Sequence, residues 1–365
     1  MIEWIHQQLE HRTREQQLRA LRSYHHLIDF CSNDYLGLRR NNLLESNIQK
    51  LLIEWNQISY GSGGSRLISG QHHYHDHVEE SIASHHGVES ALLFDNGYMA
   101  NHGLLTALGH RGMQWILDAH CHASLMVSAH QSQANGVFKF RHNDLNDLEH
   151  KLQRSPYSSV VVIESVYSMD GDLSPVDDIL TLCARYDAHL IIDEAHAFGW
   201  HGSHQTGGVY HDPHQNILAR IMTYGKGGGC HGASILSSNV VRQFLINYCR
   251  PFIYSTATAP HLVAAIQSAY NYILSHPEGG HTLMNHVNYW QEKMGTSNTS
   301  ASPIQIVRTP LARAVAQKME DAGLGVKAIL PPTVASGDEC VRICLHSFQT
   351  REDMDLCIHI LKKTL

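Results

Sequence analysis

The sequence predicts an α/β protein in which a large domain with a mostly parallel sheet precedes a small α+β domain. Two observations carry this prediction. Between residues 89 and 192, short apolar segments alternate with segments of helical character, which is typical of repeated β-α units with helices on both faces of a sheet. After residue 275 the pattern changes to short strands and a terminal helix. We expect an N-terminal segment over 1–40, a large domain over 41–275 and a small domain over 276–365.

The predicted elements of the large domain follow one another in the order strand, then helix. We expect strands over 89–94, 115–118, 137–140, 159–164 and 189–192, separated by helices that begin near Met99, Ser124, Asp144 and Ser174. The run 159–164 is rich in β-branched residues, which indicates a strand buried on both faces. The sequence Ser174-Pro-Val-Asp is typical of a helix start, with Ser174 as the capping residue and proline at the first helical position. The later elements are a helix over 261–274, strands over 304–308 and 341–345, and a terminal helix from Glu352.

Composition excludes several classes of protein. A chain of 365 residues can bury a large core, and its formal charge of -7 argues against a nucleic-acid partner. No apolar run approaches the roughly 18 residues that a membrane span needs, and the first residues lack the pattern of a signal peptide. The eight cysteines include no Cys-x-x-Cys pair, which favours a reducing compartment. We therefore expect a cytoplasmic protein with no nucleic-acid partner and no membrane partner.

The chain contains 30 histidines, and four of them fall within the stretch 72–77. Closely spaced histidines can present several imidazoles to one metal ion. This stretch precedes a predicted helix, however, and lacks the fixed pair-and-pair spacing of zinc motifs. We interpret the histidines as a compositional bias on a solvated surface and predict no metal site, while the role of the stretch 72–77 stays open.

The residues with the clearest chemistry are Lys226 and Asp193. Lys226 lies in a glycine-rich loop, where little side-chain bulk keeps it from a bound cofactor. Asp193 follows a buried strand, at the sheet edge where α/β proteins bind ligands. A lysine that can form a Schiff base and an acid that can keep a pyridinium protonated are the minimal requirements of pyridoxal phosphate (PLP) chemistry. The two segments together predict a PLP site.

Other polar residues follow predicted strands at the same edge. Gly97 and Tyr98 precede a helix whose free N–H groups and positive end suit a phosphate. His122 could stack on a flat ring, while Ser168 and His196 could contact a phenolic oxygen. Each of them also has a plain structural interpretation as an ordinary loop residue. Their position after successive strands is what favours the cofactor.

The chain also resembles a known family, the α-oxoamine synthases, which are PLP enzymes with the aspartate-aminotransferase-like fold called fold type I. The similar motifs span nearly the whole chain: Ser-Asn-Asp-Tyr-Leu-Gly-Leu at 32–38, Gly-Ser-Gly-Gly-Ser-Arg-Leu-Ile-Ser-Gly at 61–70 with His75, His-Ala-Ser-Leu at 122–125, Ser-Met-Asp-Gly-Asp at 168–172, Asp-Glu-Ala-His at 193–196, Thr-Tyr-Gly-Lys-Gly at 223–227, Tyr-Ser-Thr at 254–256 and Pro-Pro-Thr-Val at 331–334. The form of the loop 61–70 points to the branch that acts in biotin biosynthesis.

The resemblance implies a role for each matching residue. It makes Lys226, His122, Asp193 and His196 the catalytic set, with Lys226 holding PLP and moving the substrate's α-proton and Asp193 facing the pyridinium nitrogen. The resemblance also implies contacts to each part of the cofactor: His122 stacks on the ring face, and His196 and Ser168 contact the phenolic oxygen. The phosphate is bound by Gly97, Tyr98 and Thr223, and in a homodimer Thr256 contacts the phosphate of the partner subunit. Asn33 and Arg342 bind the amino acid's carboxylate. A planar guanidinium suits this last task, because it binds a carboxylate through two parallel hydrogen bonds.

The implied activity is a decarboxylative condensation of L-alanine with a pimeloyl thioester of coenzyme A or acyl carrier protein. Three departures from the family pattern are Leu330 in place of an arginine, the aromatic residues Phe198 and Trp200, and Gly-Cys-His at 229–231. Because that arginine can meet a substrate carboxylate or the acyl tail, Leu330 leaves the acyl chain open.

Three rival functions stay open beside this one. The first is another family member that uses glycine, serine or a different acyl thioester. The second is a plain aminotransferase, which fits the motifs at 32–38 and 61–70 poorly. The third is a non-enzymatic metal-binding protein that uses the stretch 72–77, and it would leave Lys226 and Asp193 unexplained.

Overall fold

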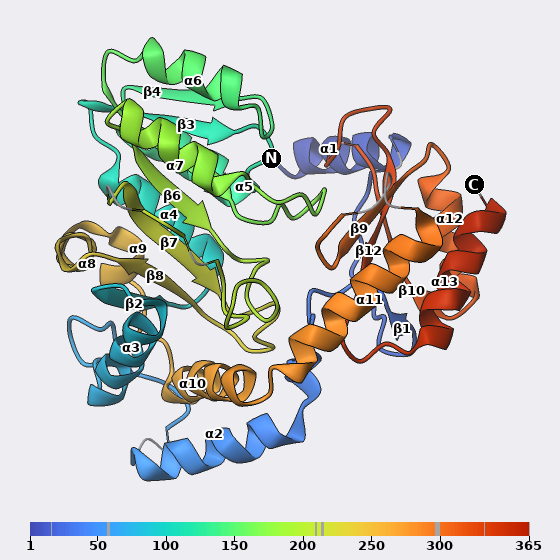
Figure 1. Cartoon of the computed structure of the whole chain (residues 1–365), viewed down its shortest axis with the longest axis horizontal. Coiled ribbons are helices and arrows are strands. Elements are labelled where there is room, and N and C mark those ends of the chain that lie inside the picture. The colour runs from blue at the N-terminus through green and yellow to red at the C-terminus, as the bar shows by residue number, and fades with distance from the viewer. Residues whose placement is uncertain are drawn as a thin grey trace.

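The computed structural model describes residues 1–15, 17–56, 59–208, 210–212, 215–295, 300–331 and 333–364, and it divides into a large and a small domain (Figure 1). Pro332, in the motif 331–334, lies outside the described residues. The strands of the large domain are β2 (Ser90–Phe94), β3 (Met113–Asp118), β4 (Gly136–Phe140), β5 (Ser158–Glu164), β6 (His189–Asp193), β7 (Ile217–Thr223) and β8 (Ala233–Ser237). They form one sheet in the order β2-β8-β7-β6-β5-β3-β4, in which only β8 runs antiparallel to its neighbours. The predicted mostly parallel sheet is therefore confirmed.

Helices cover both faces of this sheet. They are α3 (His73–His86), α4 (Gly97–Leu108), α5 (Ala123–Gln131), α6 (Leu145–Gln153), α7 (Val176–Arg185), α8 (Asn239–Tyr248), α9 (Arg250–Ile253) and α10 (Pro260–Ser275). Val160 and Val162 of β5 pack into the core that α4, α5 and α8 cover, whereas Val161 and Ile163 pack beneath α6 and α7. This alternation confirms that β5 is buried on both faces.

One expected helix start is wrong and one strand was not expected, both for local reasons. Helix α7 begins one residue later than expected, and its capping position is Pro175, with no side-chain cap. Ser174 instead donates its hydroxyl to Asn143 Oδ1 at 3.4 Å and its N–H to Ser165 O at 3.1 Å, so the serine fixes the preceding turn. The sequence also gave no signal for β7, because Arg220 interrupts its apolar run; that arginine is buried in an ion pair with Glu194.

The small domain combines a three-stranded antiparallel sheet with three helices. Its elements are β9 (Ile304–Arg308), β11 (Lys327–Ile329), β12 (Cys340–Cys344), α11 (Glu278–Met294), α12 (Ala312–Asp321) and α13 (Arg351–Thr364). The N-terminal segment joins this domain, because β1 (Ile28–Asp29) pairs with β10 (Leu324–Gly325) and because Phe30 and Tyr35 are buried in the small-domain core. Our division into 1–40, 41–275 and 276–365 stays a prediction.

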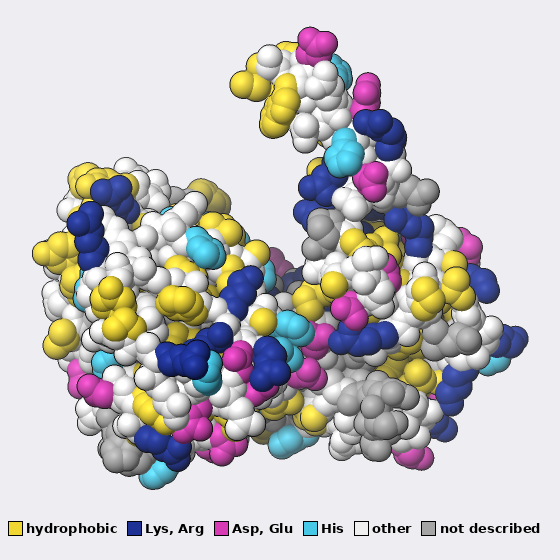
Figure 2. Space-filling view, turned by 90° about the horizontal axis from the view of Figure 1, so that it is seen from above, with side chains coloured by type: hydrophobic (Ala, Val, Ile, Leu, Met, Phe, Trp, Pro, Cys, Tyr) yellow, Lys and Arg dark blue, Asp and Glu magenta, His cyan; other side chains and the backbone are white. Residues whose placement is uncertain are grey.

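Four further observations concern the helices and the surface. Helix α1 (Ile2–Arg14) has no buried residue, and Ile2, Trp4 and Leu9 are among its exposed side chains. After the short helix η1 (Leu38–Arg40), α2 (Asn42–Glu54) packs against α10. Seen from above, two lobes meet along a hollow, and side chains of both charge signs are mixed on this face (Figure 2). Within the described ranges, the helices are all too short or too polar to cross a bilayer.

Candidate active site

The carboxyl ends of four strands lie side by side at one edge of the large sheet. In the order of the sheet, β7, β6, β5 and β3 end at Thr223, Asp193, Glu164 and Asp118. Glu164 and Asp193 are direct partners in the register of β5 and β6. Because the turns after these strands carry His122, Ser168, His196 and Lys226, the fold gathers most of the predicted cofactor residues at one edge.

Asp193 is buried and held by two hydrogen bonds. Its Oδ1 accepts the N–H of Ala195 at 2.9 Å, and its Oδ2 accepts Nδ2 of Asn101 at 2.8 Å. Asn101 lies on α4 and also donates to Ser124 Oγ at 2.9 Å. A carboxylate fixed in this way can still accept one more donor, such as a pyridinium N–H, since each oxygen has two lone pairs.

Lys226 follows β7 in the loop that leads to β8, and it is half-buried. Burial lowers the pKa of its ammonium group, while the nearby charges of Asp193 and Glu164 oppose that effect. Arg342 of the small domain also acts electrostatically on Lys226. A lysine whose pKa is lowered by burial is more often neutral, and the neutral amine is the form that attacks a carbonyl.

His122 and Glu164 form a unit that the sequence did not reveal. The N–H of His122 donates to Glu164 Oε1 at 2.6 Å, and His122 Nδ1 lies 2.8 Å from Ser124 Oγ. The His122 side chain is otherwise exposed, so its ring face is open to a flat ligand. Burial, and next the charge of Asp193, raises the pKa of Glu164 to about 8. The signal that could have identified Glu164 is its place at the end of the β-branched run next to Asp193.

His196 is buried, and its ring contacts a tyrosine of the N-terminal segment. Its Nδ1 lies 2.7 Å from the hydroxyl of Tyr35, which also donates to Asn33 Oδ1 at 3.4 Å. Burial, followed by the charges of Lys226 and Arg342, lowers the pKa of His196 well below its usual range, so the ring is neutral.

The two aromatic departures from the family pattern support this segment. Trp200 Nε1 donates to His196 O at 2.7 Å, which fixes the backbone that carries the imidazole. Phe198 packs edge-on against Tyr224 and Tyr270 in the core beneath it. Both side chains are buried, so neither of them narrows the open side of the site.

The phosphate-binding residues are predicted at the start of α4, and the geometry there fits an anion. Asn96 caps the helix by accepting the N–H of Met99 at 2.9 Å, while the first N–H groups of any helix have no partner within it. Among the described residues, the buried hydroxyl of Thr223 finds no hydrogen-bond partner. A Cβ atom at Gly97 would lie 2.4 Å from that hydroxyl, so glycine keeps the space open. Tyr98 is 49% exposed.

Thr256 is the predicted cofactor residue that lies on a loop between two helices and not in a turn after a strand. It is exposed on the loop between α9 and α10, in a small recess shared with Asp95 and Met99. The loop is held in place because Thr258 donates to Asp95 Oδ1 at 2.8 Å and because the N–H of Ala257 donates to Gly64 O at 2.9 Å.

Asn33 and Arg342 lie together although 309 residues separate them in the sequence. Arg342 Nη2 donates to Asn33 Oδ1 at 3.0 Å, and its Nε donates to Ser168 O at 2.8 Å. The guanidinium therefore reaches from the small-domain strand β12 to the loop after β5. The charge of Arg342 also acts on Lys226, so the predicted carboxylate-binding pair lies near this lysine.

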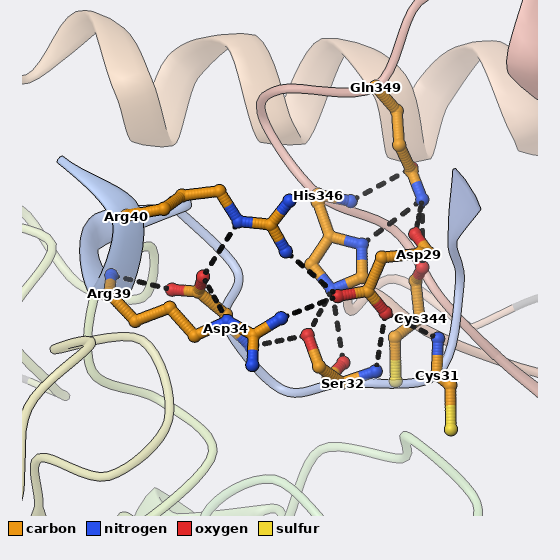
Figure 3. Close-up of polar contacts among 9 residues, drawn as sticks. All are labelled: Asp29, Cys31, Ser32, Asp34, Arg39, Arg40, Cys344, His346 and Gln349. Carbon is orange, nitrogen blue, oxygen red and sulfur yellow. Dashed lines mark hydrogen bonds and ion pairs between the residues drawn. The ribbon is translucent and has the colours of Figure 1, made fainter. Parts of the chain in front are cut away.

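A polar network fixes the segment that carries Asn33. It comprises Asp29, Cys31, Ser32, Asp34, Arg39, Arg40, Cys344, His346 and Gln349 (Figure 3). Asp29 Oδ1 accepts the N–H groups of Cys31 and Ser32 at 3.0 and 2.8 Å, which shapes the turn before Asn33. Gln349 Nε2 donates to Asp29 O at 2.8 Å, so the small domain anchors this turn. Asn33 is thereby positioned by chain segments from both ends of the protein.

The histidine stretch 72–77 does not form a metal site of three or more ligands. His75 Nε2 lies 2.8 Å from Thr258 O, and His77 packs against Trp55. In the part of the chain that the structure describes, one group of three potential metal ligands occurs, formed by His120, His142 and Asp170.

Comparisons with known proteins agree with this geometry. The family model for aminotransferases of class I and II matches residues 25–361. An 8-amino-7-oxononanoate synthase from Methylobacillus flagellatus is 35% identical over 351 residues, covering 92% of this chain and 86% of that protein. Another from Nitrosospira multiformis is 37% identical and covers 89% and 83%. A solved serine palmitoyltransferase from S. paucimobilis with bound PLP is similar with a TM-score of 0.84 and 26% identity, covering 92% and 87%. The chain therefore belongs to the class I and II aminotransferase family, as a PLP-dependent acyl-transferring enzyme of the group that contains the 8-amino-7-oxononanoate synthases.

Proposed function

We propose that this enzyme condenses L-alanine with a pimeloyl thioester to give 8-amino-7-oxononanoate, carbon dioxide and free thiol, as a step of biotin biosynthesis. The observation that carries this proposal is the Asn33–Arg342 pair, in which Arg342 contacts Ser168 O and its charge acts on Lys226. A fork of guanidinium donors beside a PLP lysine suits an α-amino acid, whose carboxylate must be held while its α-carbon reacts. The names of the relatives support the product, 8-amino-7-oxononanoate.

The cofactor contacts follow from the residues at the strand ends. PLP supplies an electrophilic carbonyl and an electron-withdrawing ring that accepts the electron pair of the substrate's α-carbon. Lys226 would hold the cofactor through that carbonyl, and once the substrate amine has displaced it, its Nζ would take the proton from the substrate's α-carbon. Asp193 keeps the ring nitrogen protonated, because its two fixed oxygens present negative charge there.

The remaining side chains orient the ring. His122 stacks on its open face, and neutral His196 together with Ser168 faces the phenolic oxygen. The hydroxyl of Thr223, with the helix start at Gly97 and Tyr98, binds the phosphate, which gives the otherwise unpartnered hydroxyl an acceptor.

The substrate side holds the amino acid while the new bond forms. Arg342 and Asn33 fix the carboxylate of L-alanine. With the carboxylate held, Lys226 would take the α-proton, and the α-carbon would attack the thioester carbonyl and expel the thiol. The carboxylate would then leave as carbon dioxide, and the α-carbon would take up a proton to give the product.

We also propose that two subunits share each site in a homodimer. Thr256 is exposed on the loop between α9 and α10, and the resemblance assigns it to the phosphate of the neighbouring subunit. The exposed apolar residues of α1 support a partner surface. Mixing Lys226→Ala subunits with Thr256→Glu subunits should restore activity that neither variant has. A monomer that is fully active at assay concentration would exclude this arrangement.

An activity matrix tests the proposed reaction. The purified enzyme with PLP is offered L-alanine, L-serine or glycine against pimeloyl, palmitoyl and acetyl thioesters, and released thiol and carbon dioxide are both measured. We expect the pair of L-alanine and pimeloyl thioester to give the highest kcat/KM. A higher value for another pair would transfer the assignment to a different α-oxoamine synthase, and amino-group transfer without carbon dioxide would indicate an aminotransferase.

A further inference from the structure

The loop at 168–172, which follows β5, lies where the large domain contacts the small domain (Figure 1). It is a tight turn, in which the N–H of Tyr167 donates to Asp172 O at 2.9 Å and the N–H of Gly171 donates to Tyr167 O at 2.9 Å. The small domain contacts this turn directly, because a Cβ atom at Gly171 would lie 2.3 Å from Ile304 O and because Ser300 donates its hydroxyl to Gly171 O. A change in the position of this loop therefore changes the fit between the domains.

Asp170 lies at the centre of this junction and has one partner in each domain. Its Oδ2 is 2.8 Å from His120 Nδ1 in the large domain, and its Oδ1 accepts Nη2 of Arg308, on β9 of the small domain, at 3.0 Å. The Asp170 side chain is only 15% exposed, so water competes weakly for these contacts. The hydrogen bond from His120 lowers the pKa of Asp170, which keeps the carboxylate charged.

A second contact holds the large-domain side of the same loop. His142 bridges Asp118 and Asp172, with nitrogen–oxygen distances of 2.9 and 3.3 Å, and its ring stacks on that of His120 at a centroid distance of 4.0 Å. Burial alone would lower the pKa of His142, but its hydrogen bonds to Asp118 and Asp172 raise it to about 9. His142 therefore stays cationic at neutral pH and secures Asp172, so that Asp170 is the link that reaches the small domain.

We propose that Asp170 is a positioning residue for the amino-acid subsite, which sets the place of Ser168 relative to Arg342 by joining His120 to Arg308. Ser168 precedes Asp170 by two residues, and its carbonyl accepts Arg342 Nε at 2.8 Å. Without the Asp170 link, the described contacts that remain between the loop and the small domain are this hydrogen bond and the contacts of Gly171 with Ser300 and Ile304. The inference rests on the proposed function, which assigns Arg342 to the substrate and Ser168 to the cofactor.

A metal site is the strongest rival interpretation of the same residues. The ligand atoms of His120, His142 and Asp170 lie within 4.8 Å of one another. The two imidazole rings are nearly parallel, however, with an interplanar angle of 10°. A metal ion lies in the plane of each imidazole that binds it, and one ion cannot lie in two parallel planes that are separated by the stacking distance. The arrangement fits stacked, hydrogen-bonded rings better than ligands of one ion.

Two readouts test the proposal. In the protein without cofactor, Asp170→Asn should increase amide hydrogen exchange at 168–172 and at 304–308. In the PLP-loaded protein, the same change should raise the Kd for L-alanine, followed by the cofactor's absorbance, about five- to tenfold, while the affinity for PLP changes less than twofold. Arg308→Gln should act in the same way, and the double variant should add little, because both remove one link.

The matched control is Asp338→Asn. Asp338 is the other carboxylate near Arg308, at 3.8 Å, and both side chains are more than half exposed there. We expect Asp338→Asn to leave both readouts at parental values. An effect equal to that of Asp170→Asn would show a general loss of negative charge and overturn the proposal, as would unchanged L-alanine binding in Asp170→Asn.

Two further results distinguish the proposal from metal binding and from a failure of the proposed function. Calorimetric titration with Zn²⁺ alone should give the same result for the parent and for Asp170→Asn. A stoichiometric Zn²⁺ site that is present in the parent and lost in Asp170→Asn would replace the proposal with metal binding. If the parent protein binds PLP but not L-alanine, the proposed function fails, whereas hydrogen exchange still shows whether Asp170 couples the loop to the small domain. Parental exchange in Asp170→Asn would overturn the coupling whatever the substrate is.

Discussion

The proposed cofactor side and the proposed substrate side of this site are built in different ways. On the cofactor side, Asp193, Glu164 and Thr223 end adjacent strands of one sheet, so a local β-α order places them together. On the substrate side, Asn33 and Arg342 come from opposite ends of the chain and meet through packing and the polar network of Figure 3. The cofactor side depends on the register of one sheet, whereas the substrate side depends on how the two domains pack against each other. Substitutions should therefore separate cofactor binding from substrate binding.

The largest effect is expected for Lys226→Ala. It removes the covalent link to PLP and the base that moves the α-proton, so turnover should fall below detection while PLP still binds noncovalently at the strand ends. Activity and bound PLP are measured on the same dialysed sample. Retained turnover would show that the cofactor side is centred on another residue.

Asp193→Asn should be nearly as damaging, because it removes the charge opposite the ring nitrogen while keeping the shape of the side chain. We expect kcat to fall by about 10²–10³-fold, in line with the loss of one well-placed electrostatic contact. The protein should remain folded by circular dichroism, since the amide oxygen still accepts the N–H of Ala195, and the contact that is lost is the one with Asn101 Nδ2. Near-parental kcat would mean that Asp193 faces something other than the cofactor.

Arg342→Lys should damage the substrate side alone. The lysine keeps the charge but loses the fork of donors, including those to Asn33 and Ser168. We expect the KM for L-alanine to rise about ten- to a hundredfold, with PLP affinity within twofold of the parent. Arg185→Lys, in an exposed pair with Glu149, serves as a control that should leave both values unchanged. A matching loss of PLP affinity would contradict the separation of the two sides.

Glu164→Gln should change the pH dependence of stability. The folded-state pKa of Glu164, about 8, exceeds its ordinary value of 4.5, so the folded protein holds an extra proton between these pH values. The contribution of Glu164 to stability is therefore complete below about pH 4.5 and is lost as the pH rises through about 8. Glutamine does not titrate, so the variant should gain stability on the parent as the pH rises from 5 to 9, by up to about 4 kcal/mol for a shift of this size.

Urea unfolding of the cofactor-free proteins at pH 5, 7 and 9 measures this gain. The exposed residue Glu80 provides the control, because Glu80→Gln should show no trend with pH. A constant difference between Glu164→Gln and the parent across this range would show that Glu164 is ionised throughout.

Leu330→Arg should have the smallest effect and refines the substrate side. Leu330 is partly buried against the small-domain core, so the parent lacks at this position the cation that the family pattern provides. We expect the parent to discriminate weakly between a pimeloyl thioester and an uncharged thioester of equal length. The arginine should sharpen the ratio of kcat/KM values by about five- to thirtyfold, which corresponds to about 1–2 kcal/mol. Strong discrimination by the parent, unchanged in the variant, would make Leu330 a neutral replacement.

The sequence predicted the cofactor side better than the substrate side for a physical reason. Strand ends can be read from local patterns, and Asp193 and Lys226 each follow an apolar run or a glycine-rich signature. Glu164 and Asn101 escaped notice because their roles depend on cross-strand register and on the face of α4, which no single motif shows. The pairing of Asn33 with Arg342 came from the resemblance alone, since nothing local in the sequence indicates a contact between distant segments.

The most direct test of the account is to reduce the PLP-loaded protein with borohydride and to map the labelled peptide. Lys226 lies among Asp193, Glu164 and Arg342, whose charges act on it, and burial lowers its pKa. We predict a single label on Lys226, with none in Lys226→Ala treated in parallel. A label on another lysine, or no label in a protein that still turns over, would contradict the assignment of the active site.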